Sequence, residues 1–234
     1  MTSISDTITA ERAADDGVEV RSLLAEAVYS QLRADIVGGR LSADERLKIA
    51  DLADRYGVSA NPVREALQQL RGEGFVVMEP NRGARVRRID EDFFRDINEV
   101  EMLIEPHLTR YFVGIATDAD VAELEAIQRQ IEALNFSDMA THSELDTRFH
   151  RLMYDHNYNR HMVDMWWNHR QILGAVTRSM GISINRRTAV IREHRAIIEA
   201  IKVQNARKAS ALVAQHVRGS SKHWIGQMRT IRRR

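Results

Sequence analysis

The chain has 234 residues, with 34 lysines and arginines against 33 acidic residues, and it contains no cysteine. This length suits one large domain or two modest ones, and a hydrophobic content of 44% is enough for a packed core. Without cysteine, disulfides and thiolate metal sites are excluded. No apolar run is long enough to span a membrane, and residues 1–20 lack the apolar core of a secretion signal, so we expect a cytoplasmic protein with no membrane partner.

The first part of the chain predicts a tail followed by a helix. Residues 1–20 hold five acidic residues and one basic residue with no hydrophobic periodicity, which predicts a flexible tail. From residue 21 onward a helix is expected, because apolar residues recur at a spacing of four from Leu24 to Ile36. Two glycines end this helix, and residues 41–47 form a polar connector.

Two short helical segments come next, separated by a turn at Val58 and Ser59. The first covers Ile49 to Tyr56. In the second, Pro62 stands in the first turn, where its missing N–H costs nothing. Apolar residues then recur at i, i+3, i+4 and i+7, which predicts one inward-facing side made of Val63, Ala66, Leu67 and Leu70.

A strand-like hairpin follows the second of these helices. Residues 75–78 are apolar, residues 79–83 have the composition of a turn, and residues 84–87 alternate as a returning strand. Helix, helix, turn, helix and hairpin together make a winged helix-turn-helix, which we assign to residues 21–88.

Beyond Asp90 strand signals vanish. We expect six consecutive helices with short connections, at about 91–114, 119–135, 138–156, 160–180, 184–203 and 206–228. Such a run makes an antiparallel helix bundle. The predicted fold is therefore mainly α: an N-terminal winged helix-turn-helix and a C-terminal antiparallel six-helix bundle over residues 89–234.

The second short helix is a candidate for reading DNA. A recognition helix presents its N-terminal residues to base edges in the major groove, and here these are Ser59, Asn61 and Arg64. Arg64 can grip a guanine with two hydrogen bonds or clamp a phosphate. The alternative is an ordinary helical hairpin in which Arg64 pairs with Glu65 or Glu45.

The hairpin adds basic residues to this candidate surface. Residues 55–88 hold seven arginines against three glutamates, an excess that suits a surface facing phosphates, although a solvated face is the alternative. Arg82, Gly83 and Arg85 lie in the predicted wing. A glycine there allows the hairpin to approach the DNA backbone or the minor groove closely.

These motifs carry a family resemblance. The pattern GVS-x-x-PVREAL, the following EGFV and the hairpin sequence NRGARV resemble the DNA-binding domain of GntR-family transcription regulators. The family commonly has a basic residue and a threonine where this chain has Ala60 and Asn61, and a Pro-Gly-Glu/Asp pattern at Ala43–Glu45. The resemblance therefore implies the fold and a role in DNA binding, without an inherited operator sequence. Arg64 matches the family's contact position and is expected to carry more of the specificity.

The bundle contains a possible metal site. Asp146 and His150 are four residues apart in a predicted helix, so they share one face and can chelate one ion. His194 and His216 lie on two later helices. One carboxylate and three imidazoles suit zinc, nickel, manganese or iron(II). Spacing alone leaves the alternative open, because the chain has nine histidines and a helical histidine is more often packed or exposed than a ligand.

A second resemblance covers residues 95–228. The patterns around Phe149-His150 and Glu193-His194, and the segment from Ala211 to Val217, resemble the FCD ligand-binding domain of the FadR branch of the GntR family. In metal-binding members these positions supply one aspartate and three histidines, which implies Asp146, His150, His194 and His216 as ligands. The resemblance implies a divalent ion, with zinc first and nickel, manganese or iron as alternatives, and an ion that anchors a carboxylate effector.

One position departs from the FCD pattern. The family usually has an arginine, often facing the pocket, where Glu101 stands, and that arginine can pair with an acid ligand. Glu101 would repel a carboxylate, so either the effector differs or another cation serves. Arg148 and Arg192 are the candidates for that cation, and the alternative is that both lie on the surface.

Taken together, the sequence predicts a ligand-responsive transcription regulator, a repressor by the commoner family behaviour, and not an enzyme. A homodimer would present two recognition helices to a near-palindromic operator, and a coupling of roughly 1–3 kcal/mol would suffice to change occupancy. Three rivals remain at this point. They are a metalloenzyme using open metal positions, a sensor for which the ion itself is the signal, and a purely architectural DNA binder.

Overall fold

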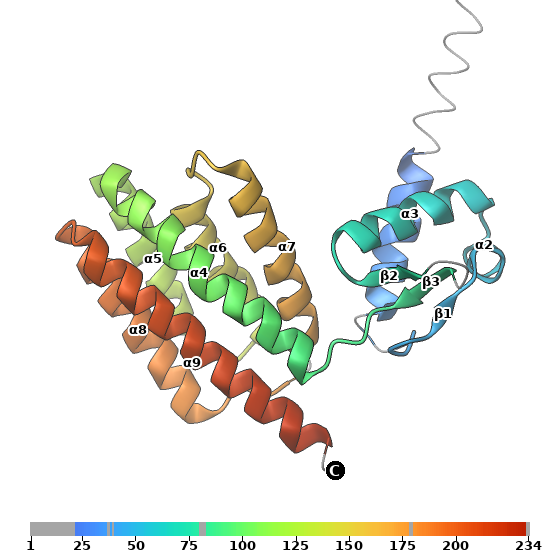
Figure 1. Cartoon of the computed structure of the whole chain (residues 1–234). Coiled ribbons are helices and arrows are strands. Elements are labelled where there is room, and N and C mark those ends of the chain that lie inside the picture. Colours follow the sequence, from blue (N-terminus) through green and yellow to red (C-terminus); the bar gives the residue numbers. More distant parts are fainter. Residues whose placement is uncertain (1–21, 37, 39, 80–82, 178–179, 233–234) are drawn as a thin grey trace, which may run out of the picture. The chain divides into compact units, whose positions relative to one another are not determined.

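The computed structural model describes residues 22–36, 38, 40–79, 83–177 and 180–232 (Figure 1). The predicted tail at residues 1–20 and the candidate Arg82 lie outside the described residues. The chain divides into two compact units between Arg88 and Ile89. Each unit is described by itself below.

The first unit is a small helical domain with a three-stranded sheet. Its elements are a helix over residues 22–36, β1 (Arg46–Leu47), α2 (Ile49–Tyr56), α3 (Ala60–Gly72), β2 (Val76–Glu79) and β3 (Gly83–Val86). The strands are antiparallel in the order β1-β3-β2. The predicted winged helix-turn-helix is confirmed. The one added element is β1, which the sequence analysis treated as connector: Leu47 is buried and pairs with Ala84 of β3.

Local chemistry explains where α2 and α3 begin and end. Gly57 ends α2 with a left-handed φ of +66°, a conformation that costs a glycine little, and its N–H bonds back to the last turn. Ser59 precedes α3 in an extended conformation. The buried residues of α3 are Pro62, Val63, Ala66, Leu67 and Leu70. The predicted inward face is therefore correct, and it leaves Asn61, Arg64, Gln68 and Arg71 exposed.

A buried carboxylate holds the first helix of this unit against α2. Asp35 is 1% exposed and accepts hydrogen bonds from Gln31, from Arg40 Nε at 2.6 Å and from the Tyr56 hydroxyl at 2.9 Å. Arg55 Nη2 lies 3.0 Å from the other side of the same carboxylate. Because Tyr56 and Arg55 belong to α2, this carboxylate sets where α2, and therefore the recognition helix that follows, lies against the first helix.

Within residues 89–177 and 180–232, the second unit has six helices: α4 (Glu91–Ile115), α5 (Asp118–Leu134), α6 (Met139–Tyr154), α7 (Arg160–Thr177), α8 (Ile184–Lys202) and α9 (Ala206–Arg232). The predicted bundle is confirmed, with ends within a few residues of expectation. Side-chain caps set several starts, since Asp90, Thr117, Asp138 and Ser183 each accept a backbone N–H at the beginning of a helix. Among the described helices, none has the length and apolar character needed to cross a bilayer.

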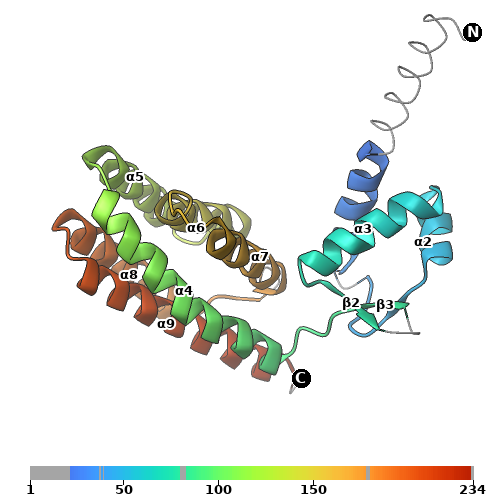
Figure 2. The ribbon, with the colours of Figure 1, turned by 45° about the horizontal axis from the view of Figure 1, so that its top comes forward.

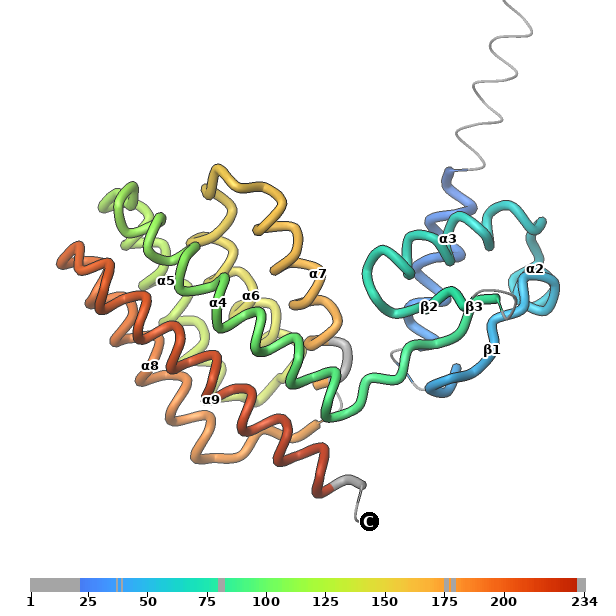
Figure 3. The backbone as a smooth tube through the Cα atoms, viewed as in Figure 1, coloured from blue at the N-terminus to red at the C-terminus, as the bar shows by residue number. Residues whose placement is uncertain are grey.

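Long helices run side by side through this unit. α9 lies along α4 over much of its length, and α8 and α9 form a helical hairpin (Figures 1 and 2). α5 packs against both α6 and α8. The tube in Figure 3 shows how the chain enters this unit through α4 and leaves it through α9.

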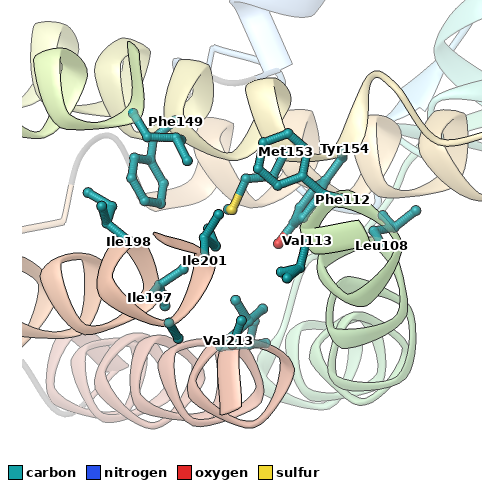
Figure 4. Close-up of a cluster of buried hydrophobic side chains, with 14 of the residues drawn as sticks. Leu108, Phe112, Val113, Phe149, Met153, Tyr154, Ile197, Ile198, Ile201 and Val213 are labelled. Atoms are coloured by element: carbon teal, nitrogen blue, oxygen red, sulfur yellow. The ribbon is translucent and has the colours of Figure 1, made fainter. Parts of the chain in front are cut away.

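The core of the bundle is apolar and contiguous (Figure 4). Phe112 of α4, Phe149 and Tyr154 of α6, Ile197 of α8 and Val213 of α9 are nearly inaccessible to solvent. Tyr154 and Phe149 stand one turn from the candidate ligands on the same helix, so the apolar core and the candidate metal site share their supporting elements. The site is thus built on packed helices rather than on loops.

The Asp35 cluster yields a stability prediction. Replacing Asp35 with alanine removes the acceptor shared by Tyr56 and two arginines, and it should lower the free energy of opening of the first unit by about 2–3 kcal/mol. Native-state hydrogen exchange of residues 22–88 in the full chain measures this quantity. Asp54→Ala, at an exposed position of α2, is the matched control and should change it by less than about 0.5 kcal/mol. Equal exchange in the two variants would contradict the role given to Asp35.

Candidate functional site

Three helices of the second unit bring four predicted ligands together. Asp146 and His150 come from α6, one turn apart, while His194 comes from α8 and His216 from α9. One ligand atom of each lies within 4.8 Å of the others. The three imidazoles are buried, with exposures of 1%, 0% and 5%. Residues up to 70 positions apart in the sequence therefore form one compact cluster.

His194 is oriented by a neighbour on α5. Its Nδ1 lies 3.0 Å from Oε1 of Gln128, and its Nε2 lies 3.5 Å from Oδ1 of Asp146. An Nδ1 proton donated to the glutamine oxygen leaves the Nε2 lone pair free. That Nε2 is buried and has no hydrogen-bond partner among the described residues. A buried nitrogen without a partner, facing a carboxylate, is suited to a cation.

The other two histidines are oriented in the same manner. His216 Nδ1 lies 2.9 Å from Oε2 of Glu193. His150 Nδ1 lies 3.4 Å from the hydroxyl of Tyr154, and that hydroxyl donates to Glu105 at 2.8 Å. The Nε2 of His150, like that of His194, is buried without a hydrogen-bond partner in the described part of the chain. Groups of this kind fix the ring orientation of metal-bound histidines.

Electrostatics hold these groups in the protonation states that a cation requires. Burial lowers the pKa of His150 to about 3 and places the pKa of His194 well below its usual range. Burial acts to raise the pKa of Asp146, but the positive charge of Arg170 leads the opposing influences, and that pKa lies well below its usual range. At neutral pH an ionised Asp146 thus lies beside neutral His150 and His194, which is the state in which these groups bind metal.

The donor set fits a divalent metal ion. One carboxylate and three imidazole nitrogens are the ligands that zinc and its neighbours in the first transition row prefer. The unpartnered Nε2 atoms of His150 and His194 are the observation that an ion in this place would explain. Arg170 contacts the other oxygen of Asp146, so one carboxylate joins the cluster to a fixed cation.

A cavity of about 120 Å³ opens beside the cluster. Its wall includes Asp146, His150 and His216 together with two cationic side chains, Arg170 of α7 and Arg186 of α8. This volume is of the same order as the roughly 150 Å³ cavity that accommodates benzene, so a ligand here must be small.

Two sequence predictions about this cavity need correction. In the described part of the chain neither Arg148 nor Arg192 lines it, and Arg148 instead pairs with Glu123 at 2.9 Å on an outer groove. The reason is helical geometry. Each stands two residues from a ligand, Arg148 from Asp146 and Arg192 from His194, and two residues turn a helix by about 200°. Glu101 does line the cavity, as the resemblance implied.

The cations that do line the cavity were missed by sequence reasoning. Arg170 stands one turn after Trp166, a nearly inaccessible residue, so the inward face of α7 was a signal that could have found it. Arg186 is 7% exposed and pairs with Glu193 at 2.9 Å. The sequence around Arg186 does not predict this position, because the side chain is held there by Glu193, seven residues further along α8, and by His216 of α9.

The candidate DNA-reading residues lie on the surface of the first unit. Arg64 Nη1 donates to Oδ1 of Asn61 at 3.0 Å, and both side chains are exposed at the start of α3. Ser59 is the exposed residue that precedes this helix. Arg64 makes no ion pair with Glu65 or Glu45 among the described residues, so its charge is available to a ligand.

The wing is partly tied into the sheet. Gly83 begins β3 with a φ of +79°, which favours glycine at this position. Arg85 Nη1 donates to the carbonyl of Asp44 at 2.9 Å, and Arg85 Nε lies 3.4 Å from Glu79. Of the predicted contacts, Arg85 is therefore already engaged within the unit.

Comparison with known families agrees with both halves of this description. The model of the bacterial regulatory proteins of the gntR family matches residues 24–86, and that of the FCD domain matches residues 96–219. The chain belongs to the GntR family. The combination of the two domains is consistent with the FadR branch of that family. This GntR-family chain is therefore a DNA-binding transcription regulator with an FCD domain, and neither domain is that of an enzyme.

Individual relatives extend over most of this GntR-family chain. It is 26% identical to the uncharacterised HTH-type transcriptional regulator YdhC of Bacillus subtilis, covering 83% of this chain and 88% of YdhC. It is 25% identical to the HTH-type transcriptional repressor GlaR of Escherichia coli, covering 81% and 90%. The solved structure of E. coli McbR/YncC has the same fold, with a TM-score of 0.64 at 19% identity over 84% of this chain and 94% of that chain.

The depressed pKa of His150 predicts how acid affects the metal-free protein. The unfolded chain takes up a proton on this residue near its ordinary pKa of 6.5, whereas the folded chain does so only near 3. Stability should therefore fall as the pH drops from about 6.5 towards 3, with His150 contributing up to about 1.4 kcal/mol per pH unit. In the presence of a chelator, urea unfolding of His150→Gln should show a correspondingly shallower pH slope. His161→Gln, at an exposed position, should keep the slope of the parent, and equal slopes in all three would refute the assignment.

Arg64 predicts a loss of sequence discrimination. Against an operator selected from random DNA, Arg64→Ala should bind roughly 5–150-fold more weakly and discriminate less among base pairs at its contact position. Arg71→Ala, near the end of the same helix, should produce a smaller change that is uniform across sequences. Fluorescence anisotropy with operator and scrambled duplexes measures both. Unchanged specificity in Arg64→Ala would remove Arg64 from base reading.

Proposed function

We propose that this regulator is controlled by a small carboxylic acid bound beside a divalent metal ion in the FCD domain. The observation that carries the proposal is the Asp/His₃ cluster, three of whose members line a small cavity together with two arginines. The cluster supplies metal ligands, and the cavity supplies room and positive charge for an anion. Both lie within one helical unit, so ligand and ion would act on the same set of helices.

Asp146, His150, His194 and His216 would hold the ion. When bound, the ion supplies positive charge and coordination positions that a carboxylate can occupy. The chain's own residues do the remaining work. Gln128, Glu193 and Tyr154 orient the imidazole rings, and the four-ligand set with nitrogen in excess favours zinc over the alternatives nickel, manganese and iron.

Arg170 and Arg186 are the proposed partners of the acid. Each lines the cavity, and each is held in place by a carboxylate, Asp146 for Arg170 and Glu193 for Arg186. A guanidinium presents paired donors to a carboxylate, so either side chain can orient an acid while the ion neutralises it. These residues take the place proposed from sequence for Arg148 and Arg192.

The DNA side of the mechanism follows from the first unit. We propose that a homodimer binds operator DNA in the cytoplasm through α3, with Arg64, Asn61, Ser59 and the wing residues Arg82, Gly83 and Arg85 in contact. Repression is the favoured sign, since the relative GlaR is a repressor. A coupling of about 1–3 kcal/mol between the acid and operator sites would change occupancy 5- to 150-fold.

Thermal unfolding tests the proposal. A ligand that binds only the folded state at 100 times its dissociation constant adds about 2.7 kcal/mol, which raises the melting temperature of a chain this size by roughly 5–10 °C. We expect metal-loaded protein to respond in this way to one of a panel of small carboxylic acids, and chelated protein not to respond. The same acid should weaken operator binding.

Matched variants separate the possible outcomes. His216→Gln should abolish the metal-dependent response, while His161→Gln, at an exposed position on α7, should keep it. A melting temperature that rises with metal but with no acid would make the ion itself the signal. An acid response that survives chelation and His216→Gln would refute the metal-anchored site.

A further inference from the structure

Acidic as well as basic side chains line the cavity beside the metal cluster. Glu101 and Glu105, one turn apart on α4, line the same space as Asp146, Arg170 and Arg186. Both glutamates are buried, with exposures of 3% and 7%. The proposed acid effector does not by itself account for these two carboxyl groups, since an ionised carboxylate cannot donate a hydrogen bond to them.

Glu101 and Glu105 are hydrogen-bonded to each other. Glu105 also accepts the hydroxyl proton of Tyr154, and Glu101 Oε1 also lies 2.5 Å from His169 Nδ1. No N–H group and no hydroxyl among the described residues donates to Glu101 Oε2. Two adjacent buried carboxyl groups can share a proton, and a ligand that brings a positive charge can take the place of that proton.

The surroundings of Glu101 keep its carboxyl group largely uncharged at neutral pH. Burial raises the pKa of Glu101 to about 8, and burial lowers the pKa of His169, so this hydrogen-bond partner favours its own neutral form. The nearby guanidinium of Arg170 already contacts Asp146. Burying a carboxyl group without a compensating partner is costly, and a cation that enters the cavity would remove this cost.

The lining of the cavity combines basic and acidic side chains. Asp146, His150 and His216 of the metal cluster, with Arg170 and Arg186, can bind a carboxylate, and Glu101 and Glu105 can accept hydrogen bonds from a second group of the ligand. A simple monocarboxylate satisfies only the first. A hydroxyl group could donate one hydrogen bond to Glu101, but it carries no charge, whereas an ammonium group offers three donors and a positive charge.

We propose that the effector is a small amino acid-type compound, whose carboxylate meets the metal cluster and the arginines and whose ammonium group donates to Glu101. This inference rests on the proposed function and specifies the chemical class of its ligand. The cavity of about 120 Å³ restricts the compound to a size near that of benzene, which excludes amino acids with large side chains. Glu101 is then a residue that determines specificity.

Matched ligand triplets test this proposal on the metal-loaded full chain. Each triplet shares one carbon skeleton and differs only in its second group: alanine, lactate and propionate; β-alanine, 3-hydroxypropionate and propionate; 4-aminobutyrate, 4-hydroxybutyrate and butyrate. By isothermal titration calorimetry we expect the amino member of at least one triplet to bind about 10–150-fold more tightly than both analogues, the range typical of a hydrogen bond to a charged group.

Glu101→Gln keeps the shape of the side chain and removes its charge. We expect it to lose most of the preference for the amino member while binding the plain acid within about threefold of the parent. Glu99→Gln, at an exposed position on the same helix, is the matched control and should keep the preference. Since the readout is a ratio of affinities within one variant, a general loss of stability cannot imitate it, and circular dichroism verifies that each variant is folded.

The outcomes distinguish this inference from the function on which it rests. Plain or hydroxylated acids that bind as tightly as their amino analogues and release the operator would overturn the inference and leave the proposed function in place. Undiminished discrimination in Glu101→Gln would also overturn it. If no acid of any class binds or alters operator affinity, the proposed function fails and the inference fails with it.

Discussion

The position of Asp146 between Arg170 and three imidazoles is the constraint on which the helical unit depends. A carboxylate on α6 contacts Arg170 of α7 and lies 3.5 Å from His194 of α8, while His216 joins from α9. Ionised groups are costly inside a protein unless each is paired. Four helices must therefore keep fixed positions around this residue, and the apolar core beside it, drawn in Figure 4, supplies the rigidity.

Polar neighbours make the cluster specific rather than merely charged. Gln128, Glu193 and Tyr154 each contact the Nδ1 of one histidine, and the Nε2 atoms of His150 and His194 have no hydrogen-bond partner among the residues that the structure describes. A ring whose Nδ1 is hydrogen-bonded while its Nε2 has no partner is typical of a metal ligand, and this pattern distinguishes a ligand set from packed histidines. Glu101 and Glu105 add a pair of buried carboxyl groups to the lining of the cavity that the cluster borders.

The two units use charge in opposite ways. In the first unit Asp35 is paired with Arg40, Arg55 and Tyr56, so its charge serves to hold helices together. Arg64 on α3 is exposed and, within the described part of the chain, bonded only to Asn61, so we expect its charge to be available for DNA. In the second unit charges are buried in a cavity that can admit a ligand. The charge that holds the first unit together is fully paired within the protein, whereas the charges assigned to function can still form hydrogen bonds or ion pairs with a ligand.

What the sequence determined by itself was local and periodic. The helices, the inward face of α3 and the winged fold followed from spacing and turn chemistry, which act over a few residues. The four members of the metal cluster were identified through the family resemblance rather than through spacing. Tertiary structure alone decided which cations line the cavity, because Arg170 and Arg186 reach it through the packing of α7 and α8, whereas Arg148 and Arg192, two residues from true cluster members, are turned away by helical geometry. It also decided that Glu101 lies buried in the cavity lining beside His169, since that contact joins residues far apart in the chain.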